Sequence, residues 1–433
     1  MTERDLEFGT IRRVSGRLLP FLLILYLFNY LDRTNVSIAA LQMNDELKFS
    51  SAAFGFGSGI FFLGYALFEV PSNLILVRVG ARRWLARIMI TWGVLACATM
   101  AVRTPAQFYV VRFLLGVAEA GFYPGIIYYT LRWFPAKYRA RAFAGFMVGI
   151  PLSRAIGGPL GGALLGLNGL GHLSGWQWLF LIEGAPSVVL GFVVLWYLTE
   201  SPTEAQWLSA EQREWLTTRL KKEQPKTLVS DSSPLRALSL PLVWLLSFPF
   251  FAAITLTYAY NFWEPTLLRA LLGTSNLSTA LLSGAIAVVA ALVQVGASVI
   301  SDRSDERCAL AALGLACGCV GFIGMALLPH SIFKLTAFVV VALTSPMFLT
   351  SFWCLPTRFL RGPAAAAGIA LVNVIGNCGG FVGPTIIGFL KDTPVGEPGA
   401  FFGIAALAFL GAVVCIGLRS LPALRQSAEL EPT

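Results

Sequence analysis

Residues 18–41 read LLPFLLILYLFNYLDRTNVSIAAL, and this stretch decides the kind of fold that the chain forms. It is a largely apolar run, and its length suits a helix that crosses the hydrocarbon core of a membrane, which takes about 20 residues. Eleven similar runs follow, at residues 52–77, 84–102, 106–131, 142–168, 176–199, 238–263, 277–300, 308–328, 331–354, 364–390 and 400–419. The sequence therefore predicts an all-α integral membrane protein with twelve transmembrane helices.

The composition of the whole chain supports this fold class. Of 433 residues, 56% are hydrophobic and only 13% are charged, and the mean hydropathy is +0.71. That is too little polar surface to cover a soluble globule of this size. Asp32 and Arg33 interrupt the first run and no small-residue cleavage site follows it, so we expect it to stay in the protein as a helix rather than act as a signal peptide.

The distribution of the basic residues indicates the membrane topology rather than a nucleic-acid partner. The net charge is +9, but 24 of the 32 Lys and Arg residues lie at the two termini and in alternate loops. Loops on the cytoplasmic side of a membrane are enriched in Lys and Arg. This pattern predicts that both termini are cytoplasmic, and the compact loops suit a bacterial inner membrane.

One long hydrophilic stretch, residues 201–237, divides six predicted spans from six. It predicts a cytoplasmic linker between an N-terminal bundle at residues 1–200 and a C-terminal bundle at residues 238–433. A carrier can be built from two such bundles, because a site between them opens to either side in turn.

Three arginines fall inside predicted spans: Arg33, Arg112 and Arg154. Each costs about 2.5–3.5 kcal/mol at the centre of a membrane helix, so buried charges of this kind face an internal cavity or pair with one another. The guanidinium group matches a carboxylate with two parallel hydrogen bonds and stays charged at any working pH. The three arginines therefore predict a substrate site for a small organic anion. For Arg154 an alternative is a structural ion pair with a buried acidic residue.

Carboxylates in the same helices are candidate proton carriers. Glu119 is seven residues from Arg112, so the two share one helix face, whereas the neighbours Asp32 and Arg33 point about 100° apart. A partly desolvated carboxylate takes up a proton more readily, and a nearby arginine has the opposite effect. We expect Asp32 and Glu119 to couple proton movement to the substrate, with a fixed ion pair between helices as the alternative. For Glu69 a structural or gating ion pair is expected, and for Glu183 a structural role.

Uncharged polar residues in the spans complete the candidate site. Asn373 and Asn377 lie four residues apart and so share one helix face, where they bind either the substrate or another helix. Tyr65 and Tyr258 offer hydroxyl groups to the cavity, although tyrosines near helix ends also serve as interfacial anchors.

Several function classes are excluded by what the sequence does not contain. It has no phosphate-binding glycine loop with its lysine, no nucleophile elbow and no cluster with metal-ligand spacing. We therefore predict that the chain is not an enzyme, needs no cofactor and is driven by an ion gradient, most simply as a monomer.

Five segments together resemble the anion:cation symporter branch of the major facilitator superfamily, and within it bacterial permeases of tartrate, phthalate and related carboxylates. They are NYLDRTNVSIA (29–39), GYALFEVPSNLILVRVGARRW (64–84), RFLLGVAEAGFYPG (112–125), GWQWLFLIEG (175–184) and AAAAGIALVNVIGNCGGFVGP (364–384). The resemblance implies two six-helix bundles, alternating access and uptake of an organic anion with protons. It also implies that Arg33, Arg112 and Tyr65 contact the substrate and that Asp32 and Glu119 bind protons.

The chain departs from that branch in the loop after the second span, where Val77 replaces the usual aspartate, and at two charged positions within or next to the spans. Arg154 stands where a small or hydroxylated residue is expected, and Glu264 stands where an apolar residue is usual. An added cavity arginine favours a dicarboxylate or an aromatic acid over a monovalent sugar acid. The alternative function is an exchanger or exporter of organic anions in the same superfamily.

Overall fold

The structure is a computed structural model, and it describes residues 3–223, 240–303, 306–329, 332–353, 355–356 and 363–420. Within these ranges the regular elements are all helices. Twelve of the segments are long and apolar enough to cross a membrane, which confirms the predicted fold class. They are Glu3–Leu47, Ser51–Val79, Ala81–Ala101, Pro105–Leu131, Ala136–Leu165, Gly175–Tyr197, Pro241–Leu272, Asn276–Ser301, Arg307–Leu327, Ile332–Phe352, Gly368–Lys391 and Gly396–Leu418.

The first six spans form the N-terminal half. Its helices are α1 (Glu3–Thr34), α2 (Val36–Leu47), α3 (Ser51–Val79), α4 (Ala81–Ala98), α5 (Pro105–Glu119), α6 (Phe122–Leu131), α7 (Ala136–Met147), α8 (Gly149–Leu165) and α9 (Gly175–Tyr197). Short 3-10 helices follow α4 (η1, Thr99–Ala101) and α8 (η2, Leu170–His172), and a third (η3, Pro202–Glu204) follows α9.

The last six spans form the C-terminal half. Its helices are α12 (Pro241–Leu272), α13 (Asn276–Arg303), α14 (Arg307–Leu327), α15 (Ile332–Ala342), α16 (Thr344–Phe352), α18 (Pro363–Asn377), α19 (Gly379–Lys391) and α20 (Gly396–Leu418). Between the halves, α10 (Ala210–Glu223) lies in the predicted linker and contacts α1. The second part of that linker, residues 224–237, lies outside the described residues, and the domain boundaries stay a prediction.

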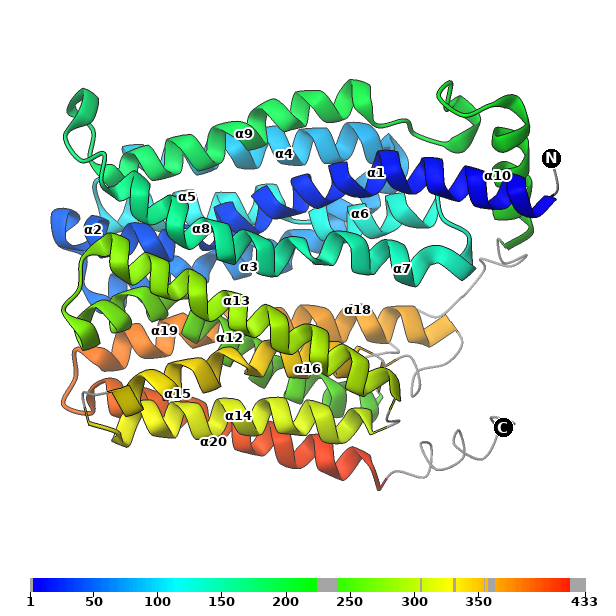
Figure 1. Cartoon of the computed structure of the whole chain (residues 1–433). Coiled ribbons are helices and arrows are strands. Elements are labelled where there is room, and N and C mark those ends of the chain that lie inside the picture. The colour runs from blue at the N-terminus through cyan, green and yellow to red at the C-terminus, as the bar shows by residue number, and fades with distance from the viewer. Residues whose placement is uncertain are drawn as a thin grey trace.

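The two halves lie side by side, with the blue-to-green helices above the yellow-to-red ones in Figure 1. The chain starts at the right of this view, where α20 also ends; we call this the terminal end and the opposite one the distal end. Contacts between the halves run from α3 to α19, from α8 to α13 and from α2 to α12. The interface between two bundles therefore runs through the centre of the molecule.

Glycines bring the halves close together at the distal end. A Cβ atom added to Gly158 of α8 would lie 2.6 Å from the carbonyl oxygen of Ala280 in α13, and one on Gly55 of α3 would lie 2.9 Å from Cα of Gly388 in α19. Only a residue without a side chain permits such an approach of two helix backbones. The distal end is consequently closed in this structure.

The fourth span is broken near the middle. α5 ends at Glu119 and α6 begins at Phe122, and between them Gly121 adopts a positive φ of 87°. Broken helices at membrane depth are tolerated where the freed backbone lines a cavity, and they mark binding sites in many carriers. The break directly follows Glu119, a predicted site residue, whereas Asn35 between α1 and α2 keeps helical angles.

The seventh span is longer than predicted. We expected it to end at residue 263, but α12 continues to Leu272. Leu267 and Leu268 are buried on the added turns, and Arg269 donates a hydrogen bond to the carbonyl oxygen of Leu41 in α2. Packing against α2 therefore extends the helix past the end of its apolar run, and Glu264 lies inside the span rather than at its edge.

Candidate functional site

Arg33 joins three helices at the centre of the molecule. Its guanidinium forms an ion pair with the carboxylate of Glu119, with Nε 3.0 Å from Oε1. Nη1 also donates to the hydroxyl oxygen of Tyr258 at 3.2 Å. Since Tyr258 belongs to α12, this one side chain links the N-terminal half to the C-terminal half.

Glu119 is held in place by the break in its span. It is the last residue of α5, and the chain turns at Ala120 and Gly121 before α6 begins. The side chain is 1% exposed, and the guanidinium of Arg33 is its cationic partner. The sequence placed Glu119 on one face with Arg112, but the structure pairs it with Arg33, which reaches it from another helix.

Arg112 is buried and has no carboxylate partner among the described residues. Its closest polar contact is a long one, 3.5 Å from Nη2 to the carbonyl oxygen of Ser58, and its Nε has no acceptor. The guanidinium lies 5.1 Å from the ring centre of Phe61, the same ring that Arg33 approaches at 5.4 Å. Two guanidinium groups thus lie against one aromatic ring, and only one of them is neutralised.

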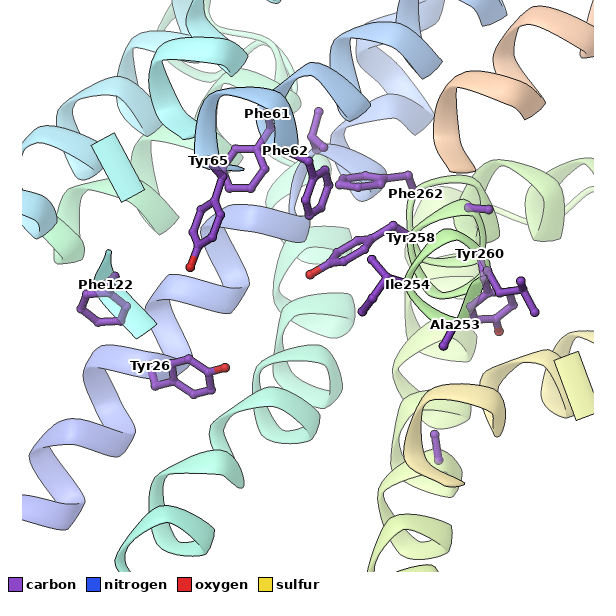
Figure 2. Packing of buried hydrophobic residues seen from close by; sticks show 14 of the residues in the cluster. Tyr26, Phe61, Phe62, Tyr65, Phe122, Ala253, Ile254, Tyr258, Tyr260 and Phe262 are labelled. Carbon is purple, nitrogen blue, oxygen red and sulfur yellow. The ribbon is translucent and has the colours of Figure 1, made fainter. Parts of the chain in front are cut away.

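Tyrosine hydroxyl groups gather around this pair of arginines. Figure 2 shows the hydroxyls of Tyr26, Tyr65 and Tyr258 pointing into the same space between the halves. Arg33 lies 5.3 Å from the ring centre of Tyr65, and the ring of Tyr258 lies 4.2 Å from that of Phe62. The surroundings combine cationic charge, hydroxyl donors and aromatic faces, which suits an anion with an organic body.

Asp32 points away from this space and into the N-terminal half. Its Oδ2 accepts hydrogen bonds from Trp92 Nε1 at 2.8 Å and from Ser187 Oγ at 2.6 Å. Asp32 and Arg33 therefore face different neighbours, as their helical spacing predicts. Asp32 is 2% exposed and has no arginine partner among the described side chains.

Arg154 and Glu264, the two departures from the family pattern, form an ion pair with each other. Nη2 of Arg154 in α8 lies 3.0 Å from Oε2 of Glu264 in α12. Glu264 also accepts hydrogen bonds from Tyr260 at 3.0 Å and from Ser283 at 2.9 Å. The pair links the two halves, so the structure realises the second of the two uses that the sequence left open for Arg154.

The two predicted polar residues of the eleventh span, Asn373 and Asn377, lie in different surroundings. Asn373 donates to Oε1 of Glu69 at 3.0 Å, which links α18 to α3. This hydrogen bond stands in place of the ion pair expected for Glu69, since no cation pairs with it among the described residues. Asn377 is the last residue of α18 and is partly buried.

A cavity of about 190 Å³ lies beside Arg154 and between the halves. Its walls come from α1, α7, α8, α12, α13, α15 and α16, and most of the lining residues are apolar, with Tyr30, Asn261 and Gln294 among the exceptions. A cavity of roughly 150 Å³ accepts one benzene ring in another protein. This space is large enough for the organic part of a small substrate.

Sequence reasoning missed Tyr26 and Phe61. The signal was present for both, because Tyr26 is seven residues before Arg33 and Phe61 is four residues before Tyr65, spacings that place each pair on one helix face. Both were hidden by the abundance of aromatic residues in membrane spans. Tyr260 was a candidate from the sequence as a neighbour of Tyr258, and the structure shows it bound to Glu264, four residues later on the same helix face.

The sequence model of the Major Facilitator Superfamily matches residues 22–384. The chain belongs to this superfamily. It is 44% identical over 422 residues to a candidate tartrate transporter of Agrobacterium vitis, a match that covers 96% of this chain and 95% of that one. It is 39% identical to a quinolone resistance transporter of Acinetobacter baumannii, over 96% of this chain and 94% of that one. This major facilitator is therefore a transporter and not an enzyme, as predicted.

Solved structures show the same fold. A bacterial homologue of the human lysosomal transporter Spinster, crystallised in an inward-facing and occupied conformation, superposes with a TM-score of 0.76 at 18% identity, covering 94% of this chain and 97% of that one. The protein is accordingly a multi-pass membrane protein with the two-bundle architecture of this superfamily.

Proposed function

We propose that this major facilitator takes up a small organic anion together with protons by alternating access. The observation that carries the proposal is the central trio: Arg33 is neutralised by Glu119, while Arg112 lies buried beside it without a carboxylate. A buried cation without a partner is costly, so the site gains free energy when an anion enters. Arg33 and Arg112 are the proposed carboxylate-binding residues, with Tyr65 and Tyr258 beside them.

The Arg33–Glu119 ion pair supplies a route for proton coupling. A substrate carboxylate and Glu119 compete for the same guanidinium, and a proton on Glu119 removes that competition. Binding of the proton and binding of the anion therefore favour each other, as linkage requires. Asp32, in the bundle interior, is proposed as a second proton-binding residue.

The relatives and the cavity support the proposed substrate class. The relative named for tartrate supports a small carboxylate or dicarboxylate, and the largely apolar cavity beside Arg154 supports an aromatic acid. Because Glu264 neutralises Arg154, Arg154 can bind a second negative charge of the substrate only when the Arg154–Glu264 ion pair breaks. Asn373 can likewise bind the substrate only when its hydrogen bond to Glu69 breaks. Asn377, on the same helix, is proposed to bind the substrate beside it.

The orientation in the membrane is also part of the proposal. The distribution of Lys and Arg supports cytoplasmic termini, which makes the terminal end cytoplasmic and the distal end external. The bacterial relatives support a location in the inner membrane, with the protein acting as a monomer. An inward proton gradient would then drive uptake.

The test is proton entry into proteoliposomes, recorded with an internal pH dye while mono- and dicarboxylates are added outside. Uptake with protons is expected for one class of acid, and Glu119→Gln is expected to abolish it while the exposed control Glu204→Gln does not. The relative named for quinolone resistance supports an exporter or exchanger as the second candidate. Exchange of preloaded acid for external acid without proton entry would establish that alternative and overturn symport.

A further inference from the structure

A second, smaller cavity lies near the distal end, between the two halves. It measures about 30 Å³, which is room for one or two water molecules. Polar side chains from both halves line it, among them Asn35, Ser37, Arg154, Glu183 and Glu264. None of the roles proposed above uses Glu183.

Glu183 is buried and poorly partnered. It is 2% exposed, and neither carboxyl oxygen has a hydrogen bond of normal geometry with a described residue. The amide of Asn35 lies beside it, 5% exposed, and within the described residues neither its oxygen nor its nitrogen has a hydrogen bond of normal geometry. Asn35 is therefore a weak partner of Glu183, and neither group is fully satisfied at the edge of this small cavity.

The neighbouring Glu264 has a different environment. Three donors reach its carboxylate, namely Arg154, Tyr260 and Ser283. The one cation that lines the cavity among the described residues is therefore already engaged. An ionised carboxylate buried without a cation or donors costs several kcal/mol, whereas the protonated acid costs far less.

The other groups around Glu183 do not compensate a negative charge. From α1 comes the carboxylate of Asp32, which would repel it, and from α4 comes the thiol of Cys97, whose sulfur contacts the carbonyl oxygen of Leu181. From α13 comes the hydroxyl of Ser283, which Glu264 engages. The acidic residues of α2 lie near its far end, where Glu46 accepts a hydrogen bond from Trp176.

We infer that Glu183 binds a proton when the distal end closes and gives it up when that end opens. In the closed arrangement Gly158 and Ala280 seal the two halves together, and the Arg154–Glu264 pair bridges them beside the cavity. Separation of the halves at this end breaks the pair and lets water in. A hydrated Glu183 can then release its proton to that water, and it must take one up again before the dry cavity re-forms.

The proton that Glu183 binds on closure sets the direction of the pH effect. Closure binds one proton, so a lower pH on the distal side favours the closed arrangement and a higher pH favours the open one. If the distal side is external, acid outside favours the closed arrangement of the carrier. The inference needs only the rocking of two halves, and it holds or fails separately from proton symport.

The first test is the distance between spin-labelled noncanonical residues at Leu170 and Leu272, which lie on opposite halves at the distal end. Without substrate, the wild type should shift from short to long distances as the pH rises. Glu183→Gln, a permanently neutral isostere, should keep the short distance at every pH, while Glu204→Gln should follow the wild type. A wild type without pH dependence, or a variant that retains it, would overturn the inference.

The second test detects the proton on the carboxyl group of Glu183 directly. The infrared spectrum of the wild type in the distal-closed state should contain a carbonyl band of a protonated carboxylic acid that is missing from Glu183→Gln. Identical spectra in this region would show that Glu183 is ionised and would refute the inference. If Glu183→Gln does not fold, Glu183→Met, which has similar length and no proton to bind, serves in both tests.

Discussion

Arg154 and Glu264 form an ion pair of 3.0 Å across the interface between the two halves of the carrier. The Glu264 side chain is 1% exposed and that of Arg154 is 18% exposed, so the pair is largely shielded from water. Each residue taken alone is a departure from the family pattern, and the contact explains both together. In the alternating access that we propose, opening of the distal end separates the two halves and breaks this pair.

We expect single substitutions of this pair to be more harmful than the double substitution. Glu264→Gln leaves a buried guanidinium without its carboxylate, and loss of one partner of a buried pair costs about 3–5 kcal/mol. Arg154→Gln leaves the opposite charge. The double variant removes both charges and should recover much of the thermal stability. A double-mutant cycle measures this, from the melting temperatures of the wild type, both single variants and the double variant in detergent. A double variant that loses as much stability as the two single variants together would contradict the prediction.

Glu119→Gln should uncouple anion binding from pH. In the wild type, protonation of Glu119 frees Arg33, so the anion should bind more tightly as the pH falls, by up to about tenfold per pH unit for one linked proton. The glutamine variant resembles the protonated state, so its affinity should be high and nearly independent of pH. Titration calorimetry at several pH values measures this dependence. An unchanged pH dependence in the variant would exclude Glu119 as the linked group.

Arg112→Met should stabilise the empty protein and abolish anion binding. The guanidinium is 1% exposed and has no carboxylate partner among the described residues, and replacing buried charges by apolar groups of similar size can stabilise proteins by about 1–4 kcal/mol. The melting temperature should therefore rise without substrate, and the increase that an anion causes in the wild type should vanish. A destabilised variant that still responds to anions would refute the proposed role of Arg112.

Gly158→Ala should hinder closure of the distal end. The added Cβ would lie 2.6 Å from the carbonyl oxygen of Ala280, and overpacking of this kind costs about 1–3 kcal/mol, roughly a 5- to 150-fold shift in population toward the open arrangement. The neighbouring Gly157→Ala is the matched control, because its Cβ would meet only the side chain of Leu31, at 3.7 Å. Transport rate and the Leu170–Leu272 label distance report the difference. Equal behaviour of the two variants would show that the contact does not limit closure.

The candidate site could be anticipated only in part. The charged residues within the spans were identified from the sequence because hydropathy makes an arginine or a carboxylate in a long apolar run conspicuous. Their partners were harder to find. The shared face of Arg112 and Glu119 suggested that these two act together, but the packing of the N-terminal helices brings Arg33 of α1 to Glu119 of α5 instead. Helical spacing describes neighbours within one helix and says nothing about a side chain from another.

The sequence by itself determined the twelve spans, the superfamily and the set of intramembrane charges, because each follows from local hydropathy or from motifs read along one helix. Only the tertiary structure decided which charges pair: Arg33 with Glu119, Arg154 with Glu264, and neither Arg112 nor Glu183 with an opposite charge among the described side chains. These pairings join residues 86 and 110 positions apart in the chain. They depend on how whole helices pack and where they break, and an ion pair forms only when that packing brings two charges within a few ångströms of each other.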